Sequence, residues 1–161
     1  MARGAMVSLV LLGAVVSGMS HRPLMAQVVR NQPMFTDTKL GPRFIPDPTV
    51  LRGLSGGEAY TETVAGRLKT ETGSCVGFIS DKPDHEVRLT SFFNYLNLQV
   101  ASSGDTILLV RGPGGTWCND DRTLAGPSIA GQWMPGDYQI WVGSINSEQY
   151  LPYELQFSEA R

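Results

Sequence analysis

Residues 135–144 read Pro-Gly-Asp-Tyr-Gln-Ile-Trp-Val-Gly-Ser, and this stretch decides the fold class. After the Pro-Gly turn, Tyr138, Ile140 and Val142 alternate with a glutamine and with Trp141. Successive side chains of a β-strand point to opposite faces, so the alternation predicts a strand with one buried face. Three apolar residues outnumber one, and we therefore expect Trp141 to be exposed or to lie under the N-terminal part of the chain.

The same period of two recurs on both sides of this stretch. Residues 85–90, 95–100 and 153–157 alternate in the same way, and residues 107–110 form a continuous apolar run that is typical of a central strand. Clusters of Gly, Pro, Asp and Ser separate these runs, as in antiparallel sandwiches. The chain is therefore predicted to be all-β, an antiparallel β-sandwich of jelly-roll type. We expect about eight strands, near residues 62–69, 74–80, 86–91, 94–101, 106–111, 128–133, 137–143 and 151–158.

The first 26 residues have the organisation of a targeting segment. Arg3 precedes the apolar run from Ala5 to Met19, and the small residue Ala26 follows a polar stretch. This pattern predicts a secretory signal peptide cleaved after Ala26. The alternative is an uncleaved anchor, although the run is shorter than the roughly 20 residues that span a bilayer. We expect an exported protein, periplasmic or extracellular, with membrane association if the segment is retained.

Residues 27–58 differ in composition and periodicity from the predicted sandwich domain at residues 59–161. They contain four prolines, and their hydrophobic residues follow neither helical nor strand period. Proline restricts the residue before it to extended conformations, so this segment is expected to be an extended arm. The arm is expected to lie along the core, to reach a partner, or to be a disordered leader. Its candidates for interaction are Phe35, Phe44 and Ile45.

Cys75 and Cys118 are the two cysteines of the 161-residue chain. An even pair of cysteines in an exported protein usually forms a disulfide. The bridge would close a loop of roughly 40 residues, which corresponds to about 4 kcal/mol of stabilisation in the chain-entropy model. The alternative is a pair of buried free thiols.

Several short motifs between residues 71 and 157 occur in a characteristic order: Ser74-Cys75 with Gly77-Phe78-Ile79, Pro83-Asp84-His85, Ser103-Gly104-Asp105-Thr106, Gly112-Pro113, Trp117-Cys118-Asn119-Asp120-Asp121 and Pro135 to Ser144. Through them the chain resembles small secreted β-sandwich domains related to bacterial pre-peptidase C-terminal (PPC) domains. The resemblance implies a PPC-like sandwich without protease activity of its own. Stand-alone members of this kind often carry a peptidase-like label.

Composition and motifs argue against several functions. With 13 basic and 15 acidic residues, the net charge of −2 excludes broad electrostatic binding to nucleic acid as the expected function. Residues 53–57 fit the loose G-x-S-x-G pattern around Ser55, but that motif needs a strand before it and a helix after it. His85 is the only histidine after residue 26, and we expect it on the surface beside Asp84. We therefore assign no catalytic residues and expect no enzyme; a serine hydrolase is a remote alternative.

Oxygen-bearing side chains follow the second cysteine. Asn119, Asp120 and Asp121 are weak candidates for a structural calcium site, because Ca²⁺ prefers oxygen ligands. Four further aspartates would add ligands if the loops converge: Asp81, Asp84, Asp105 and Asp137. The competing interpretation is a hydrogen-bonded turn, since Asn and Asp satisfy turn backbone groups themselves. No other cofactor is expected.

Trp117, Trp133 and Trp141 all lie in the second half of the chain and complete the set of interaction candidates. Exposed tryptophans anchor protein interfaces or stack on sugars. We therefore expect a non-catalytic exported binding or interaction module. It would dock on another periplasmic protein, or serve as an accessory subunit on the periplasmic side of a membrane complex. The alternative is a carbohydrate- or cell-surface-binding domain, with the structural calcium as an option.

Overall fold

Strand β12 (Gly136–Ser144) organises the larger of two facing sheets in the computed structural model, which describes Met1, residues 37–121, Thr123 and residues 125–160. β12 pairs antiparallel with β7 on one side and with β9 on the other, and its end meets β6. Shorter strands extend this sheet: β1 joins β7 in parallel, β10 joins β9 and β3 joins β6. The bounds are β1 Thr38–Leu40, β3 Ala59–Tyr60, β6 Phe78–Ile79, β7 His85–Leu89, β9 Thr106–Gly112 and β10 Gly115–Asn119.

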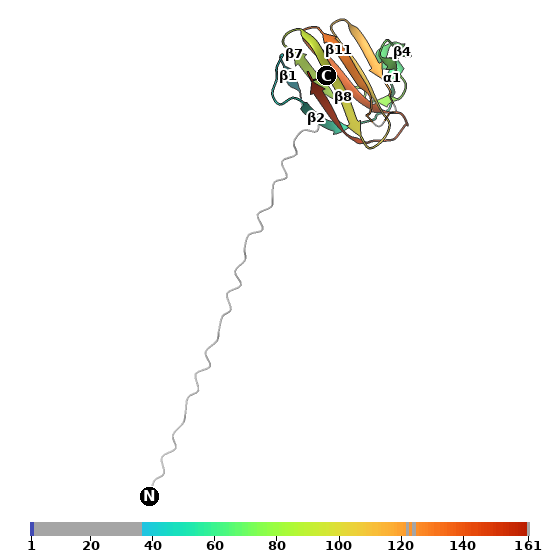
Figure 1. The fold of residues 1–161 in the computed structure, drawn as a ribbon. Coiled ribbons are helices and arrows are strands. Elements are labelled where there is room, and N and C mark those ends of the chain that lie inside the picture. The colour runs from blue at the N-terminus through green and yellow to red at the C-terminus, as the bar shows by residue number, and fades with distance from the viewer. Residues whose placement is uncertain (2–36, 122, 124, 161) are drawn as a thin grey trace. The chain divides into compact units, whose positions relative to one another are not determined.

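The second sheet has four antiparallel strands in the order β11-β8-β13-β2. A two-stranded hairpin of β4 and β5 and the short helix α1 complete the described elements (Figure 1). The predicted antiparallel β-sandwich is therefore confirmed. The remaining bounds are β2 Thr49–Leu54, α1 Thr61–Ala65, β4 Lys69–Thr70, β5 Gly73–Ser74, β8 Phe93–Ser102, β11 Ser128–Trp133 and β13 Pro152–Ser158.

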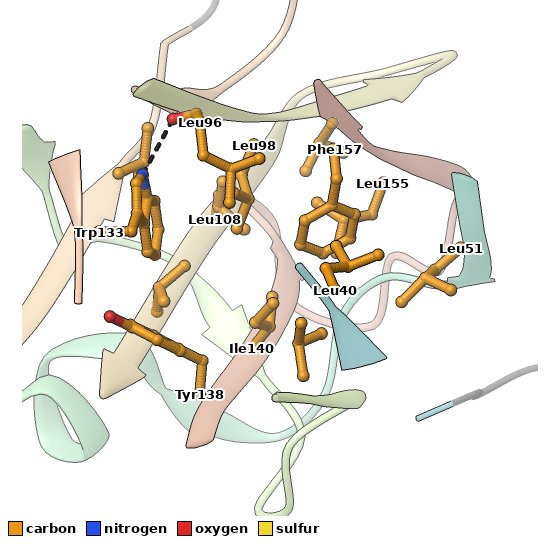
Figure 2. Close-up of a cluster of buried hydrophobic side chains, with 14 of the residues drawn as sticks. Leu40, Leu51, Leu96, Leu98, Leu108, Trp133, Tyr138, Ile140, Leu155 and Phe157 are labelled. Carbon is orange, nitrogen blue, oxygen red and sulfur yellow. Dashed lines mark hydrogen bonds between the residues drawn. The ribbon is translucent and has the colours of Figure 1, made fainter. Parts of the chain in front are cut away.

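The main core lies between the two sheets (Figure 2). Tyr138, Ile140 and Val142 of β12 are buried in it, as their alternation predicted. The opposite sheet contributes leucines, valine and aromatic residues from β8, β11 and β13, including Leu96 and Leu155. Burial of each such side chain stabilises the fold by roughly 2 kcal/mol relative to an exposed position.

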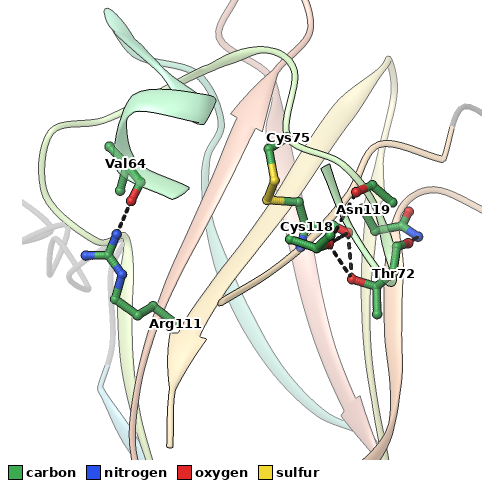
Figure 3. Close-up of a disulfide and its surroundings, with 8 residues drawn as sticks. Val64, Thr72, Cys75, Arg111, Cys118 and Asn119 are labelled. Atoms are coloured by element: carbon green, nitrogen blue, oxygen red, sulfur yellow. Dashed lines mark hydrogen bonds between the residues drawn. A yellow bond between two sulfur atoms is a disulfide. The ribbon is translucent and has the colours of Figure 1, made fainter. Parts of the chain in front are cut away.

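A second hydrophobic cluster lies on the other face of β12. Here Trp141 is only 2% exposed and packs with Leu109, Ala65 and the Cys75–Cys118 disulfide. The disulfide joins the segment after β5 to β10, with an S–S distance of 2.06 Å and a Cα–Cα distance of 5.2 Å (Figure 3). The predicted bridge is confirmed. The expectation of an exposed or arm-covered Trp141 is wrong, because α1 and the cross-linked segment cover it instead.

The described part of the predicted arm, residues 37–58, contributes to both sheets. β1 pairs with β7, and β2 pairs with β13 along six residues from Thr49 to Leu54. Of the three alternatives for this segment, the described part lies along the core. The strand at β2 was not predicted, because the prolines nearby obscured its period. The predicted signal segment from residue 2 and residues 27–36, including Phe35, lie outside the described residues.

The expected strand at residues 62–69 is wrong. Residues 61–65 form the single helical turn α1, which ends at Gly66 with a left-handed φ of 73°. The Gly66 N–H donates to the Glu62 carbonyl at 2.8 Å, a common way to close a helix. The turn places Ala65 over Trp141, and this tertiary contact outweighs the local strand period. Among the described residues, no helix has the length and apolar content to cross a membrane.

Two tyrosine rings lie directly over glycines of neighbouring strands. Tyr138 covers Gly112, where a Cβ would approach the ring to 2.2 Å. Tyr153 covers Gly53, its cross-strand partner, where a Cβ would lie 2.4 Å from the phenol oxygen. Both glycines are therefore required by close approach of a side chain.

Removal of the disulfide tests its contribution to this fold. We expect the double variant Cys75→Ala/Cys118→Ala to lose about 4 kcal/mol of unfolding free energy, because its unfolded chain is no longer restricted by the loop. Urea denaturation followed by tryptophan fluorescence measures the change. Wild-type protein unfolded in the presence of a reductant is the control and should resemble the variant. Coincident midpoints for oxidised wild type and variant would contradict the expectation.

Candidate functional site

An open groove of about 920 Å³ lies on the outer face of the larger sheet, beyond the part that α1 covers. Its floor is built by outward side chains of β7 and β12, which alternate with the core residues of the same strands. Strand register places Lys39, Arg88 and Asp137 in one row across β1, β7 and β12. A second row contains Glu86, Gln139 and Arg111, across β7, β12 and β9.

Charges in the groove are incompletely neutralised. Lys39 lies in register with Arg88, and like charges that face each other across strands are unfavourable. The Arg88 guanidinium is 3.6 Å from the Asp137 carboxylate, and both side chains are more than half exposed. Neither Lys39 nor Glu86 forms an ion pair with another described residue. The groove therefore combines three cationic side chains with three carboxylates: Lys39, Arg88 and Arg111, and Asp37, Glu86 and Asp137.

Arg111 forms the boundary between the groove and the covered half of the sheet. Its guanidinium lies 5.5 Å from the Trp141 ring centroid, a cation–π arrangement. It also donates to the carbonyl oxygen of Val64 in α1 (Figure 3). These two contacts fix the orientation of Arg111 at the edge of the groove.

A second hollow, of about 190 Å³, lies at the lateral opening between β10 and β11. Trp117 and Trp133 meet there with ring centroids 5.9 Å apart, and the Tyr138 ring lies 5.2 Å from that of Trp133. The structure thus brings two of the predicted interaction residues together. Trp133 is largely buried, and its indole nitrogen donates to the Leu96 carbonyl at 2.9 Å (Figure 2).

The other described candidates lie elsewhere. Phe44 is partly buried and packs against Phe93, with ring centroids 6.2 Å apart. Ile45 is 94% exposed in the proline-rich loop between β1 and β2. That loop is held by Glu159, whose carboxylate accepts from the Arg43 N–H and whose own N–H donates to Asp47 at 3.1 Å. Neither Phe44 nor Ile45 lines the groove or the aromatic hollow.

A buried polar network connects the two sheets. His85 is only 1% exposed, and its Nε2 lies 2.8 Å from the Tyr153 hydroxyl. The expectation of a surface histidine is wrong, although alternation of residues 85–89 already placed it on the face of Val87 and Leu89. The sequence gave no indication of its partner, because Tyr153 lies 68 residues away.

Asp84 is an ionisable group beside this network whose pKa is altered by burial. It is 5% exposed, and it accepts a hydrogen bond from the Val142 N–H at 2.7 Å. Burial raises the pKa of Asp84 to about 7, against the opposing effect of hydrogen bonds with Val142 and Ser80. Burial, together with the nearby Asp84 carboxylate, also raises the pKa of Tyr153. The sequence predicts Asp84 only as an additional calcium ligand if the loops converge, and gives no indication of this burial.

Ser55, the central residue of the G-x-S-x-G pattern, is completely buried. Its Oγ lies 2.8 Å from the Ser144 Oγ and accepts from the Leu151 N–H at 3.1 Å. It follows directly on β2, and the short helix α1 begins only at Thr61 after the intervening strand β3. These contacts give Ser55 a part in joining chain segments, in a setting unlike the exposed turn of a hydrolase nucleophile.

The Asn119-Asp120-Asp121 segment adopts a hydrogen-bonded turn. The Asn119 side-chain oxygen accepts from the Asp121 N–H at 2.8 Å, and its amide nitrogen donates to the Thr72 carbonyl (Figure 3). Asp121 in turn accepts from the Thr123 N–H at 3.0 Å. Within the part of the chain that the structure describes, no three His, Cys, Asp or Glu side chains group as a metal site would require.

The raised pKa of Asp84 predicts a specific pH dependence of stability. Between about pH 4 and 7 the folded protein retains a proton that an unfolded aspartate, with its ordinary pKa of 3.8, has released, so stability falls as pH rises. We expect Asp84→Asn to lose this component, and Asp137→Asn, on the surface, to retain it. Urea midpoints measured across this pH range provide the test. Parallel profiles for wild type and Asp84→Asn would contradict the assignment.

Comparisons with known proteins give similarity without a function. No protein-family model matches the chain. An uncharacterized protein of Synechococcus elongatus is 30% identical over 86 residues, which cover 51% of this chain and 63% of that protein. The chain therefore spans less than two thirds of that relative. Among solved structures, the pre-peptidase C-terminal domain of collagenase from Bacillus anthracis is similar, with a TM-score of 0.44 and 10% identity over 77% of this chain and 96% of that one.

Proposed function

We propose that this protein is a non-catalytic, exported binding module that docks on another exported protein, including as an accessory subunit on the periplasmic side of a membrane complex. The observation that carries the proposal is the open groove on the larger sheet. Its volume of about 920 Å³ is at the upper end of the range for ligand pockets, and it has no cover among the described residues. A groove of this size suits an extended segment or a loop of a partner protein.

The charges of the groove support a protein partner. A partner that places a carboxylate opposite Lys39 and Arg88 would relieve the like-charge contact across these strands. A basic residue of the same partner would pair with Glu86, which forms no ion pair among the described residues. Complementary charges of this kind increase the specificity and the rate of association more than the affinity.

Two further features support export and a non-catalytic role. A disulfide is stable in oxidising compartments and is rare in the reducing cytosol. The serine and the histidine from which a hydrolase would be assembled are buried in hydrogen-bonded positions between structural elements. The scaffold therefore presents its charged groups for binding and keeps its reactive groups away from solvent.

Charge reversal in the groove tests the proposal. The full chain would be purified gently from solubilised membranes and from the soluble exported fraction, and companions would be identified by mass spectrometry. We expect a stoichiometric companion with the wild type and its loss with Lys39→Glu/Arg88→Glu. The companion should also dissociate as ionic strength rises, because exposed charge pairs are screened by salt.

Arg52→Glu is the matched control, because it reverses an exposed arginine on the opposite sheet, 2.7 Å from Glu154. This variant should retain the companion. A protein that is monomeric in every fraction, or a companion that survives reversal at Lys39 and Arg88 but not at Arg52, would overturn docking through the groove.

A further inference from the structure

The aromatic hollow is the space of about 190 Å³ at the side of the sandwich that Trp117, Trp133 and Tyr138 line. It lies where β10 of the larger sheet and β11 of the smaller sheet approach each other without pairing, since β10 pairs with β9 and β11 with β8. Trp117 only partly fills this opening, because its side chain packs against the core and remains half-buried. Met134, at the rim, is 54% exposed.

The aromatic side chains present apolar surface to the hollow. The Trp133 nitrogen is satisfied by the Leu96 carbonyl, and the Tyr138 hydroxyl donates to the Met134 carbonyl at 2.8 Å. A ligand therefore meets their ring carbons and not their polar atoms. At the rim of this opening the Gln132 side chain is exposed, whereas the Thr72 hydroxyl already donates to the Cys118 carbonyl at 2.7 Å.

A polar hollow of about 210 Å³ adjoins the aromatic hollow at Trp117. The two share Trp117 and Gly114 as lining residues. The polar hollow has Arg67, Glu71 and Thr116 in its lining. Arg67 and Glu71 are exposed and form no ion pair with another described residue, so their hydrogen-bonding groups are available to a ligand.

We propose that these two hollows form a binding site for a neutral disaccharide unit of a glycan. A pyranose ring combines an apolar C–H face, which packs on indole, with a rim of hydroxyl groups, which needs planar polar partners. One ring would lie in the aromatic hollow against Trp117 and the next beside Arg67 and Glu71. No charged side chain lines the aromatic hollow, whose one ionisable group is the hydrogen-bonded Tyr138 hydroxyl. The adjoining hollow is lined by one positive and one negative side chain, Arg67 and Glu71. A neutral sugar therefore fits the two hollows best.

The size of the site agrees with this ligand. Each hollow is smaller than the roughly 300 Å³ at which pockets for whole small molecules begin, whereas the two together exceed it. Two linked rings therefore match the site better than a single ring does. The aromatic hollow shares Tyr138 with the charged groove, but none of the charged side chains of the groove lines either hollow, so different variants test sugar binding and protein docking.

Titration of the full chain with cellobiose, maltose and N,N′-diacetylchitobiose, followed by isothermal calorimetry and by tryptophan fluorescence, tests the proposal. We expect at least one disaccharide to bind with a Kd of millimolar order or tighter, as is typical for a small site, and to alter the fluorescence of Trp117. Arg67→Ala and Gln132→Ala change exposed side chains and should each weaken binding about tenfold or more, which corresponds to the loss of one or two hydrogen bonds.

Trp117→Phe keeps an aromatic ring in the partly buried position and should weaken binding while the protein stays folded, as monitored by its circular dichroism. Tyr150→Ala, which removes an exposed aromatic ring outside both hollows, should bind like the wild type. Absence of binding by all three disaccharides would overturn the proposal, as would binding that is unaffected by Arg67→Ala and Trp117→Phe. Binding of an extended peptide at these residues in place of sugar would assign the hollows to a protein partner. Lys39→Glu/Arg88→Glu should leave sugar binding unchanged, so failure here is distinguishable from failure of the groove.

Discussion

Burial of β12 on both of its faces is the constraint on which the rest of the structure depends. One face supplies Tyr138, Ile140 and Val142 to the core between the sheets, and the other places Trp141 in a second cluster. A strand that is apolar on both faces needs cover on both. On the outer face this cover is α1 and the segment around Cys75, which the Cys75–Cys118 bridge attaches to β10. The groove is the part of the outer face that this cover leaves open.

The sequence predicted those parts of the fold whose information is local. Alternation at residues 95–100 and 153–157 identified β8 and β13, and the even pair of cysteines in a chain with a signal-like leader predicted the disulfide. The helical turn α1 and the burial of Trp141 could not be predicted, because each depends on a contact between segments distant in the chain. The alternation of residues 85–89 did indicate the buried position of His85, but histidine is intermediate in its tendency to be buried, so its residue type did not decide the question.

The candidate sites show the same division. Proximity of Trp117 and Trp133 follows from the closing of two sheet edges, and no spacing in the sequence encodes it. The groove follows from the strand register, which sets Lys39 on one side of Arg88 and Asp137 on the other. By contrast, the sequence argument against a nucleophile at Ser55 relied on the absence of a strand before it and of a helix after it. The structure places β2 directly before Ser55 and buries the Ser55 hydroxyl against Ser144.

The tyrosine rings that lie on glycines also constrain how this protein can change over time. At Gly112 and Gly53 the ring occupies the volume of any side chain, so a larger residue is tolerated only when the tyrosine is replaced by something smaller. Substitutions of the glycine and of the tyrosine in each pair are therefore strongly coupled in their effects on stability. Tyr138 and Tyr153 belong to different sheets, and the atoms that crowd each glycine come from its own tyrosine. In descendants of this chain, the loss of one glycine should thus coincide with the loss of its own tyrosine and leave the other pair intact.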